Sequence, residues 1–215
     1  MAEGLPIVLP GKRAAIAGRT GAGKSTLANW LAWHSPGKFV ILNPKFTRAY
    51  NELPNCVRVD GLDFERVVDL IEDDEVRFIN VCPDGEDSSA ESMDEFVGDL
   101  HKAYSNIGLL ADELYTLHIR GQAGPGLVGW LTRGRELGQS FIGLTQRPAW
   151  VSRFIFSESD YICAMDLALK DDRKRMYEMS GKDEMEVRLP PRYWHWYDVA
   201  ADELTTYAPI PVNRG

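Results

Sequence analysis

The chain has 215 residues, of which 44% are hydrophobic and 26% charged, and a formal net charge of −8 at pH 7. This composition is typical of a globular protein, and the length suits one well-buried α/β domain better than two. No apolar stretch approaches the ~20 residues needed to cross a bilayer. Residues 1–6 lack the basic and apolar regions of a secretory signal. We therefore expect a soluble, cytoplasmic protein with no membrane segment.

Charge is unevenly distributed along the chain. Residues 60–99 contain 15 acidic residues and two arginines, whereas residues 118–156 contain five arginines and one acidic residue. The overall acidity argues against a general nucleic-acid binder, but the basic stretch is compatible with a local surface that faces phosphates. The acidic stretch has a simpler interpretation as a solvated face.

Apolar runs alternate with segments of helical spacing. The runs predict buried strands at residues 13–17, 39–42, 76–81, 107–111, 141–145 and 161–165, with further strand structure over 193–207. Helices are predicted over residues 25–35, 63–74, 127–137 and 171–179, and another begins with a capping box at residues 92–95. Residues 121–126 are expected to form a flexible loop. This alternation predicts an α/β fold with a mostly parallel central sheet and helices on both faces, and no linker divides residues 1–215 into two domains.

The first motif follows the strand predicted at residues 13–17. Residues 18–25 match the P-loop pattern GxxxxGK[ST], in which glycines let backbone N–H groups close around phosphates at a helix N-terminus. Lys24 is expected to reach the β- and γ-phosphates of ATP, and the Ser25 hydroxyl to bind Mg²⁺. The predicted ATP-binding residues are Gly18, Arg19, Thr20, Gly21, Ala22, Gly23, Lys24, Ser25 and Thr26. The alternative is a glycine-rich turn that binds no ligand.

The second motif is an acidic strand end. The apolar run 107–111 delivers Asp112 and Glu113 to its carboxyl end, where ligands bind in parallel sheets. Asp112 is expected to hold Mg²⁺, and Glu113 to polarise the attacking water as a general base. A strand that ends in Asp-Glu is common, but combined with a P-loop it favours ATP hydrolysis over phosphoryl transfer to a small molecule.

The third motif is a polar strand end. The run 141–145 is followed by Gln146, whose amide is expected to lie beside the other strand ends and to sense the γ-phosphate. An ordinary loop glutamine is the alternative interpretation.

These motifs resemble those of the FtsK–HerA superfamily of ring-forming, DNA-pumping ATPases. Four features occur in the family's order: the P-loop, Asn43-Pro44-Lys45, Asp112-Glu113, and Arg135-Glu136-Leu137-Gly138 followed by Thr145-Gln146-Arg147-Pro148. The resemblance covers about residues 13–181 and leaves a C-terminal strand extension at about 190–212. Asn43 stands where the family typically has an acid, so that acid's role does not carry over. The small size looks most like the branch that packages viral genomes into capsids.

The resemblance implies a RecA-like (ASCE) P-loop core, a hexameric ring with ATP between subunits, and double-stranded DNA in the central channel. A capsid or portal protein is a candidate partner. The resemblance also implies that an arginine from one subunit completes the neighbour's site. Arg135 fits by spacing, and Arg133 and Arg147 are alternatives.

The loop at residues 120–126 is the candidate DNA-facing element. It has small residues, one cation and no acid, so Arg120 is the predicted DNA contact, made to phosphates without base readout. A plain surface loop is the alternative.

The leading functional prediction is an ATP-hydrolysing, double-stranded DNA translocase that packages a viral genome. Conjugation or filamentous-phage assembly ATPases are alternatives on the same fold. A P-loop kinase for a nucleotide or small molecule and an ATP-dependent switch that binds proteins are alternatives of other classes.

Overall fold

The computed structural model describes residues 5–210, apart from the side chain of Glu86. Its main element is a sheet of nine strands in the order β11-β10-β9-β1-β8-β5-β2-β4-β3. The strands are β1 (Arg13–Ala17), β2 (Lys38–Leu42), β3 (Cys56–Asp60), β4 (Phe78–Cys82), β5 (Ile107–Ala111), β8 (Ser140–Thr145), β9 (Tyr161–Ala164), β10 (Trp194–Asp198) and β11 (Glu203–Tyr207). Two further short strands, β6 (His118–Ile119) and β7 (Gln122–Ala123), form a separate hairpin.

The sheet is mostly parallel, as the sequence predicts. Strands β9, β1, β8, β5, β2, β4 and β3 pair in parallel, and β10 and β11 add an antiparallel pair beside β9. The predicted C-terminal strand extension corresponds to this pair, and its last two residues, 211 and 212, lie outside the described residues. The parallel strands all end at one edge of the sheet, which we call the carboxyl edge.

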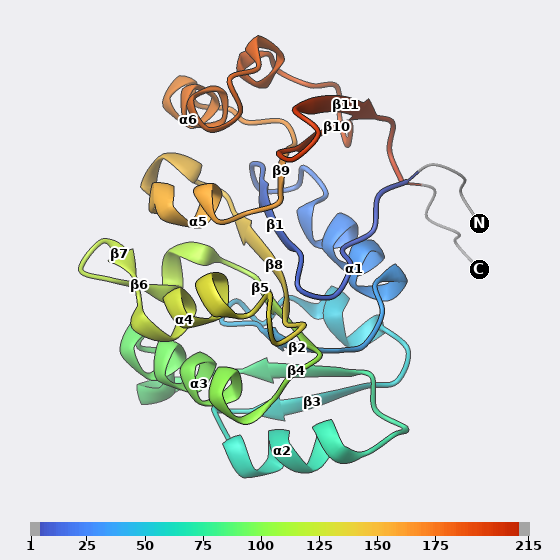
Figure 1. Cartoon of the computed structure of the whole chain (residues 1–215), viewed down its shortest axis with the longest axis vertical. Helices are drawn as coiled ribbons and strands as arrows, with labels where there is room; N and C mark the ends of the chain where they lie inside the picture. The colour runs from blue at the N-terminus through green and yellow to red at the C-terminus, as the bar shows by residue number, and fades with distance from the viewer. Residues whose placement is uncertain (1–4, 211–215) are drawn as a thin grey trace.

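Helices cover both faces of the sheet (Figure 1). They are α1 (Lys24–His34), α2 (Phe64–Glu72), α3 (Ala90–Ala103), α4 (Pro125–Arg133), α5 (Arg153–Ser157) and α6 (Lys170–Ser180), and the short 3₁₀ helices are η1 (Arg48–Glu52), η2 (Gly85–Ser88), η3 (Leu114–Leu117), η4 (Pro148–Trp150) and η5 (Asp183–Glu186). Alternate residues of β1 serve different cores: Ala15 and Ala17 pack with residues of α2 to α6, whereas Ala14 and Ile16 pack with residues of α1 and η1. Because β1 is buried on both faces, it is apolar throughout.

Several local predictions are wrong in detail. The capping box predicted at residues 92–95 does not form, because α3 begins at Ala90 and Ser89 is its N-cap, accepting a hydrogen bond from the Ser92 amide. The predicted flexible loop is partly the β6–β7 hairpin, and the helix predicted over 127–137 is α4, which runs from Pro125 to Arg133. Strand β3 escaped prediction because it is an edge strand of mixed polarity with only Val59 buried.

None of the helices within residues 5–210 is both long enough and apolar enough to span a bilayer. The fold instead positions a site at the carboxyl edge, since the loops that follow β1, β8, β5 and β2 meet there as neighbours.

Candidate active site

The P-loop connects β1 to α1 and is attached to two neighbouring strands. The Gly18 amide donates to the Thr145 carbonyl at the end of β8 (3.1 Å), and the Arg19 amide donates to the Asp166 carbonyl after β9 (2.9 Å). Gly21 and Gly23 have φ values of 77° and 106°, a left-handed conformation that favours glycine. The loop therefore presents the N-terminus of α1, which attracts anions.

Lys24 lies in the first turn of α1 with only 8% of its surface exposed. Its ammonium donates to the carbonyls of Gly18 (2.7 Å) and Arg19 (3.2 Å). Burial, followed by the nearby Lys45 charge, lowers the pKa of Lys24 to about 8. A phosphate ligand would stabilise the charged form of this lysine.

Asp112 follows β5 and is held by two hydroxyl groups. Tyr50 donates to Oδ1 and Thr47 donates to Oδ2, each at 2.6 Å. Burial and the Asp112 charge raise the pKa of Tyr50 well above its ordinary value, so this phenol stays a donor. Both hydroxyls come from the η1 region, which packs against α1. No ion pair to Asp112 occurs within the described part of the chain.

Glu113 is buried beside Asp112, and its two carboxylate oxygens differ. Oε2 accepts from the Lys45 ammonium at 2.5 Å. Oε1 is buried and has no hydrogen-bond partner among the described residues. A buried carboxylate oxygen without a donor is costly unless a ligand or water supplies one. The geometry therefore leaves one oxygen of Glu113 able to accept a proton.

Gln146 contacts the P-loop directly. Thr20 donates through its hydroxyl to the side-chain carbonyl of Gln146 at 2.6 Å. The residue after β8 is thus linked to the P-loop, as expected of a polar strand end beside β1.

Most of these groups line one cavity of about 840 Å³. It is lined by Thr20, Gly21, Gly23, Lys24, Ser25, Thr26, Asp112 and Gln146 from the predicted site. Gly18, Arg19, Ala22 and Glu113 are not part of its lining, although the P-loop contacts and the Asp112–Glu113 dipeptide keep them adjacent.

Ser25 and Asp112 suit the predicted Mg²⁺. Both residues line the cavity, and the Tyr50 hydroxyl donates to Asp112 Oδ1 at 2.6 Å. A single carboxylate and a hydroxyl fit a Mg²⁺ held mainly by nucleotide phosphates and water. No cluster of three or more acidic, histidine or cysteine side chains suited to a metal exists among the described residues.

The three candidate arginines occupy different places. Arg135 lies at the edge opposite the P-loop, where its guanidinium pairs with Asp160 at 2.8 Å. Arg133 is exposed at the end of α4 near that same edge. Arg147 lies at the carboxyl edge, pairs with Asp172 at 3.0 Å and covers the Trp150 ring at 4.0 Å. The basic stretch of the sequence is therefore divided between two edges of the sheet.

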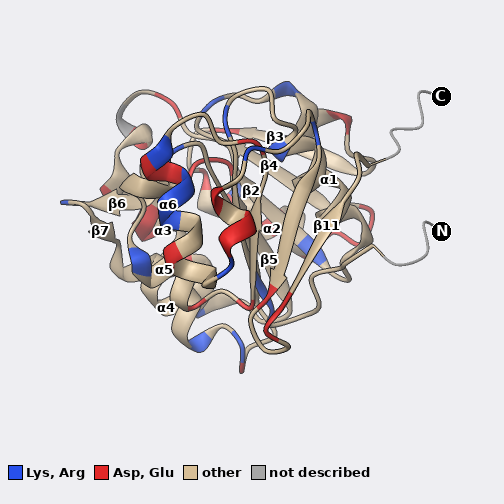
Figure 2. Cartoon of the chain, turned by 90° about the horizontal axis from the view of Figure 1, so that it is seen from above, with Lys and Arg blue, Asp and Glu red and all other residues tan. Residues whose placement is uncertain are grey.

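Arg120 lies at the tip of the β6–β7 hairpin in a left-handed conformation, and it is exposed. Figure 2 shows this hairpin at the left edge of the molecule with a basic position at its tip. His118 at the hairpin's base connects two site loops, since Nδ1 contacts the Leu114 carbonyl at 2.7 Å and Nε2 accepts from the Ser152 amide at 2.9 Å. The hairpin is thus tied to the segments that follow Glu113 and Gln146.

Sequence reasoning missed four contact residues of the site. Thr47 and Tyr50 bind Asp112, Lys45 binds Glu113, and the Asp166 side chain binds Arg19 at 2.6 Å. Lys45 had a usable signal, because it lies in the Asn-Pro-Lys segment that matches the family pattern. Thr47, Tyr50 and Asp166 lie in η1 or in loops whose sequences carry no phosphate-binding pattern.

The fold and the site define a class: the chain is an α/β P-loop ATPase of the RecA-like type, with a nucleotide-binding P-loop next to an acidic strand end. In sequence, it is 27% identical over 212 residues to the DNA packaging ATPase P9 of Enterobacteria phage PRD1, covering 93% of this chain and 88% of that protein. No family model matches the sequence.

In structure, the chain is similar to B204, the DNA-packaging ATPase from Sulfolobus turreted icosahedral virus, with a TM-score of 0.71, 20% identity, and coverage of 94% of this chain and 98% of that one. It is also similar to the genome packaging NTPase B204 from Sulfolobus turreted icosahedral virus 2 in complex with ATP-γS, with a TM-score of 0.73, 19% identity and the same coverages. The predicted resemblance to viral packaging ATPases of the FtsK–HerA type is therefore confirmed.

Proposed function

We propose that this protein is the ATP-hydrolysing motor that moves double-stranded DNA during viral genome packaging. The observation that carries the proposal is the sequence similarity to phage PRD1 P9, a DNA packaging ATPase, over 93% of the chain. The buried, half-satisfied Glu113 beside a P-loop supports hydrolysis as the chemical step.

In the proposed mechanism, backbone amides of residues 18–26 and the ammonium of Lys24 bind the phosphates of ATP. Lys24 exchanges its bonds to the carbonyls of Gly18 and Arg19 for phosphate oxygens, which stabilise its charged form. Ser25 and Asp112 would hold Mg²⁺, which neutralises phosphate charge.

Glu113 is the proposed general base. Among the described residues no donor reaches its Oε1, which we assign to accept a proton from the attacking water, while the Lys45 ammonium fixes the orientation of the carboxylate through Oε2. Gln146 senses the γ-phosphate, and its hydrogen bond to Thr20 gives it a direct mechanical connection to the P-loop.

The proposal includes a hexameric ring in which an arginine acts on the neighbour's ATP. Arg135 remains the candidate, with Arg133 and Arg147 as alternatives; for Arg135 this requires its guanidinium to leave Asp160. Arg120 is the proposed DNA contact, supported by its exposure at the tip of a hairpin tied to the loop after Glu113. A capsid or portal protein is the proposed docking partner.

The decisive experiment measures the ATPase rate with and without double-stranded DNA, together with mass by light scattering. A packaging motor forms a ring, and DNA stimulates its hydrolysis in a salt-sensitive manner. A conjugation or assembly ATPase on this fold would also form a ring, so transfer of DNA into empty capsids separates it from a packaging motor. A monomer that transfers phosphate to a nucleotide acceptor and ignores DNA would be a kinase and would contradict the proposal.

Two variants test the chemistry. Lys24→Ala should abolish ATP binding, whereas Glu113→Gln should bind ATP and lose roughly 100-fold or more of its turnover, because an amide accepts no proton from water. Exposed residues of α3 provide matched controls: Lys102→Ala and Glu95→Gln should behave like the wild type. Normal ATP affinity in Lys24→Ala, or wild-type turnover in Glu113→Gln, would contradict the assigned roles.

A further inference from the structure

A second cation, Arg192, lines the same cavity as Lys24. It comes from the segment of residues 187–193 that joins η5 to β10, far from the P-loop in sequence. Arg192 is exposed and has φ of 66°, a left-handed conformation that is uncommon for a residue with a side chain. Such strain persists where surrounding structure fixes it, and it is frequent at ligand-binding sites.

The side chain of Arg192 passes over the P-loop. A Cβ added to Gly23 would lie 3.9 Å from Arg192 Cγ and 3.3 Å from Met165 Cε. The aliphatic part of Arg192 therefore lies against the backbone just before Lys24. No hydrogen bond or ion pair within residues 5–210 engages its guanidinium, so its donors are available to a ligand in the cavity.

The segment that carries Arg192 is attached to the P-loop through a buried carboxylate. Arg188 donates to both oxygens of Asp166, at 2.8 Å and 2.7 Å, and Arg19 of the P-loop donates to Oδ2 at 2.6 Å. Asp166 is 4% exposed. The hydrogen bond from Arg188, together with that from Arg19, lowers the pKa of Asp166 to about 2 despite burial, so the bridge stays ionised. Arg192 lies four residues after Arg188, the residue that pairs with Asp166.

We propose that Arg192 binds the phosphates of the nucleotide held by the P-loop of its own chain, and that the Arg188–Asp166–Arg19 bridge positions it. The inference rests on the proposed function, which places ATP in this cavity. It adds to the site a phosphate-binding residue that lies outside the P-loop motif. A planar guanidinium suits bidentate binding of phosphate oxygens.

Phosphate is favoured over the base because Arg192 lies against the P-loop glycine rather than against the apolar wall. That wall includes Trp194, which is fully buried and stacked on Tyr207 at 4.5 Å. The aliphatic stem of Arg192 therefore enters the cavity beside Gly23, the residue before Lys24.

The test measures dissociation constants of wild type, Arg192→Ala and Arg192→Lys for ATP-γS, GTP-γS and inorganic tripolyphosphate. Arg192→Ala should weaken all three ligands by roughly 10-fold or more, since hydrogen bonds to charged groups are worth that much. Arg192→Lys should lie between alanine and wild type. Arg66→Ala removes an exposed cation from α2, on the opposite part of the sheet, and should change nothing.

The positioning role has its own measurement. Arg188→Ala should weaken tripolyphosphate binding several-fold in addition to any fall in the melting temperature of the ligand-free protein, because the buried Asp166 loses a partner, and Arg188→Lys should restore part of the affinity. A fall in melting temperature with unchanged affinity would assign the bridge a structural role only and would remove this part of the proposal.

Two outcomes overturn the assignment of Arg192. If Arg192→Ala changes the preference for ATP-γS over GTP-γS but not the tripolyphosphate affinity, the residue contacts the base. If mixing Arg192→Ala with Lys24→Ala restores hydrolysis at low ATP, the residue acts on a neighbour instead of its own chain. Wild-type protein that binds no ATP-γS would instead overturn the proposed function, whereas tight wild-type binding that Arg192→Ala leaves unchanged overturns only this inference.

Discussion

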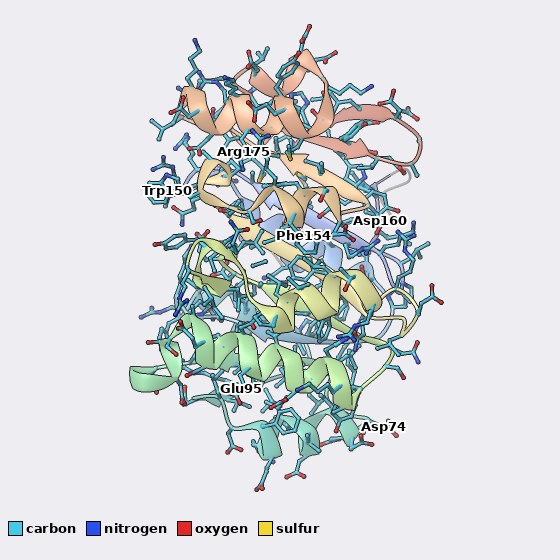
Figure 3. The ribbon with its side chains drawn as sticks, turned by 60° about the vertical axis from the view of Figure 1, so that its left-hand side comes forward. Asp74, Glu95, Trp150, Phe154, Asp160 and Arg175 are labelled. Atoms are coloured by element: carbon cyan, nitrogen blue, oxygen red, sulfur yellow. The ribbon has the colours of Figure 1, made fainter. Side chains whose placement is uncertain are left out.

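Two buried aspartates at opposite edges of the sheet have opposite surroundings. Asp160, before β9, accepts from Lys12 (2.9 Å), Arg13 (3.1 Å) and Arg135 (2.8 Å). Asp112, after β5, accepts from the hydroxyls of Thr47 and Tyr50, and no other side-chain acceptance by Asp112 occurs among residues 5–210. Figure 3 labels Asp160 on the side of the molecule opposite Trp150, a residue of the carboxyl edge.

The difference separates a structural carboxylate from one suited to bind a ligand. Burial would raise the pKa of Asp160, but the hydrogen bonds from Lys12 and Arg13 outweigh it and lower that pKa, so the charge is already neutralised by protein. Hydroxyl donors orient Asp112 without cancelling its charge. A buried carboxylate left in that state is able to stabilise an added cation.

The largest expected effect is on turnover. Asp112→Asn should reduce ATP hydrolysis by on the order of 100-fold or more, because the site loses its one carboxylate ligand for Mg²⁺. Asp160→Asn should keep turnover within a few-fold of wild type when rates are normalised to folded protein. Steady-state ATPase assays over a range of Mg²⁺ concentrations measure both, and equal losses in the two variants would erase the distinction.

The second expected effect is on stability, and here Asp160→Asn should lose more than Asp112→Asn. Asp160→Asn should lower the free energy of unfolding by about 3 kcal/mol, since the buried Arg13 then loses the nearer of its two carboxylate partners and keeps only Glu158 at 3.9 Å. Asp112→Asn should lower it by less, about 1 kcal/mol, because the amide oxygen still accepts from one of the two hydroxyls and no buried cation loses a partner. Urea denaturation of the two variants measures the difference.

The third expected effect concerns Arg135, which pairs with Asp160 in this structure and would have to leave it to reach a neighbour's ATP. If Arg135 acts on a neighbour's ATP, mixing inactive Lys24→Ala with inactive Arg135→Ala should restore activity, with a maximum at an intermediate ratio. Some interfaces in mixed rings then combine an intact P-loop with an intact Arg135, and positioned positive charge at the γ-phosphate strongly favours hydrolysis.

Subunit exchange must be confirmed independently in that experiment. If mixed rings stay at the activity of the mutants, Arg135 does not act on a neighbour's ATP, and its role is the structural ion pair with Asp160. Repeating the series with Arg133→Ala and Arg147→Ala would then decide between the two remaining arginines.

The smallest expected effect is a proton uptake at the carboxyl edge. With the Lys24 pKa at about 8 in the ATP-free protein, this lysine is mostly neutral at pH 9, and bound phosphates restore its charge. ATP binding at pH 9 should therefore take up nearly one proton, which calorimetry in buffers of different ionisation enthalpy measures. Lys45→Met should reduce the uptake, because the Lys45 charge helps to lower this pKa.

The same shift has a consequence for stability. The pKa of Lys24 in the folded chain lies below its ordinary value of 10.5, so the unfolded chain binds more protons between about pH 8 and 10.5. This group's contribution to the free energy of unfolding should therefore rise with pH across that window. If the free energy of unfolding instead fell with pH across this window, and the fall disappeared in Lys24→Met, the lowered pKa of Lys24 would be contradicted.

Contiguous stretches of the chain were enough to predict its local structure. Strand β1 was predicted with its observed bounds, and so was β5, because runs buried on both faces are apolar throughout. The P-loop and the Asp112–Glu113 strand end were likewise readable, since contiguous residues shape each of them.

Contacts between residues far apart in the sequence could not be predicted in the same way. Strand order brings the end of β5 within reach of α1 although β8 lies between β5 and β1, and it places Arg135 at the edge away from its own P-loop. Arg192 lines the cavity from a loop, and Tyr50 of η1 donates to Asp112, although neither residue lies in a recognisable sequence pattern. Such contacts depend on how helices and loops pack over the finished sheet, and packing joins residues whose spacing along the chain carries no period or motif.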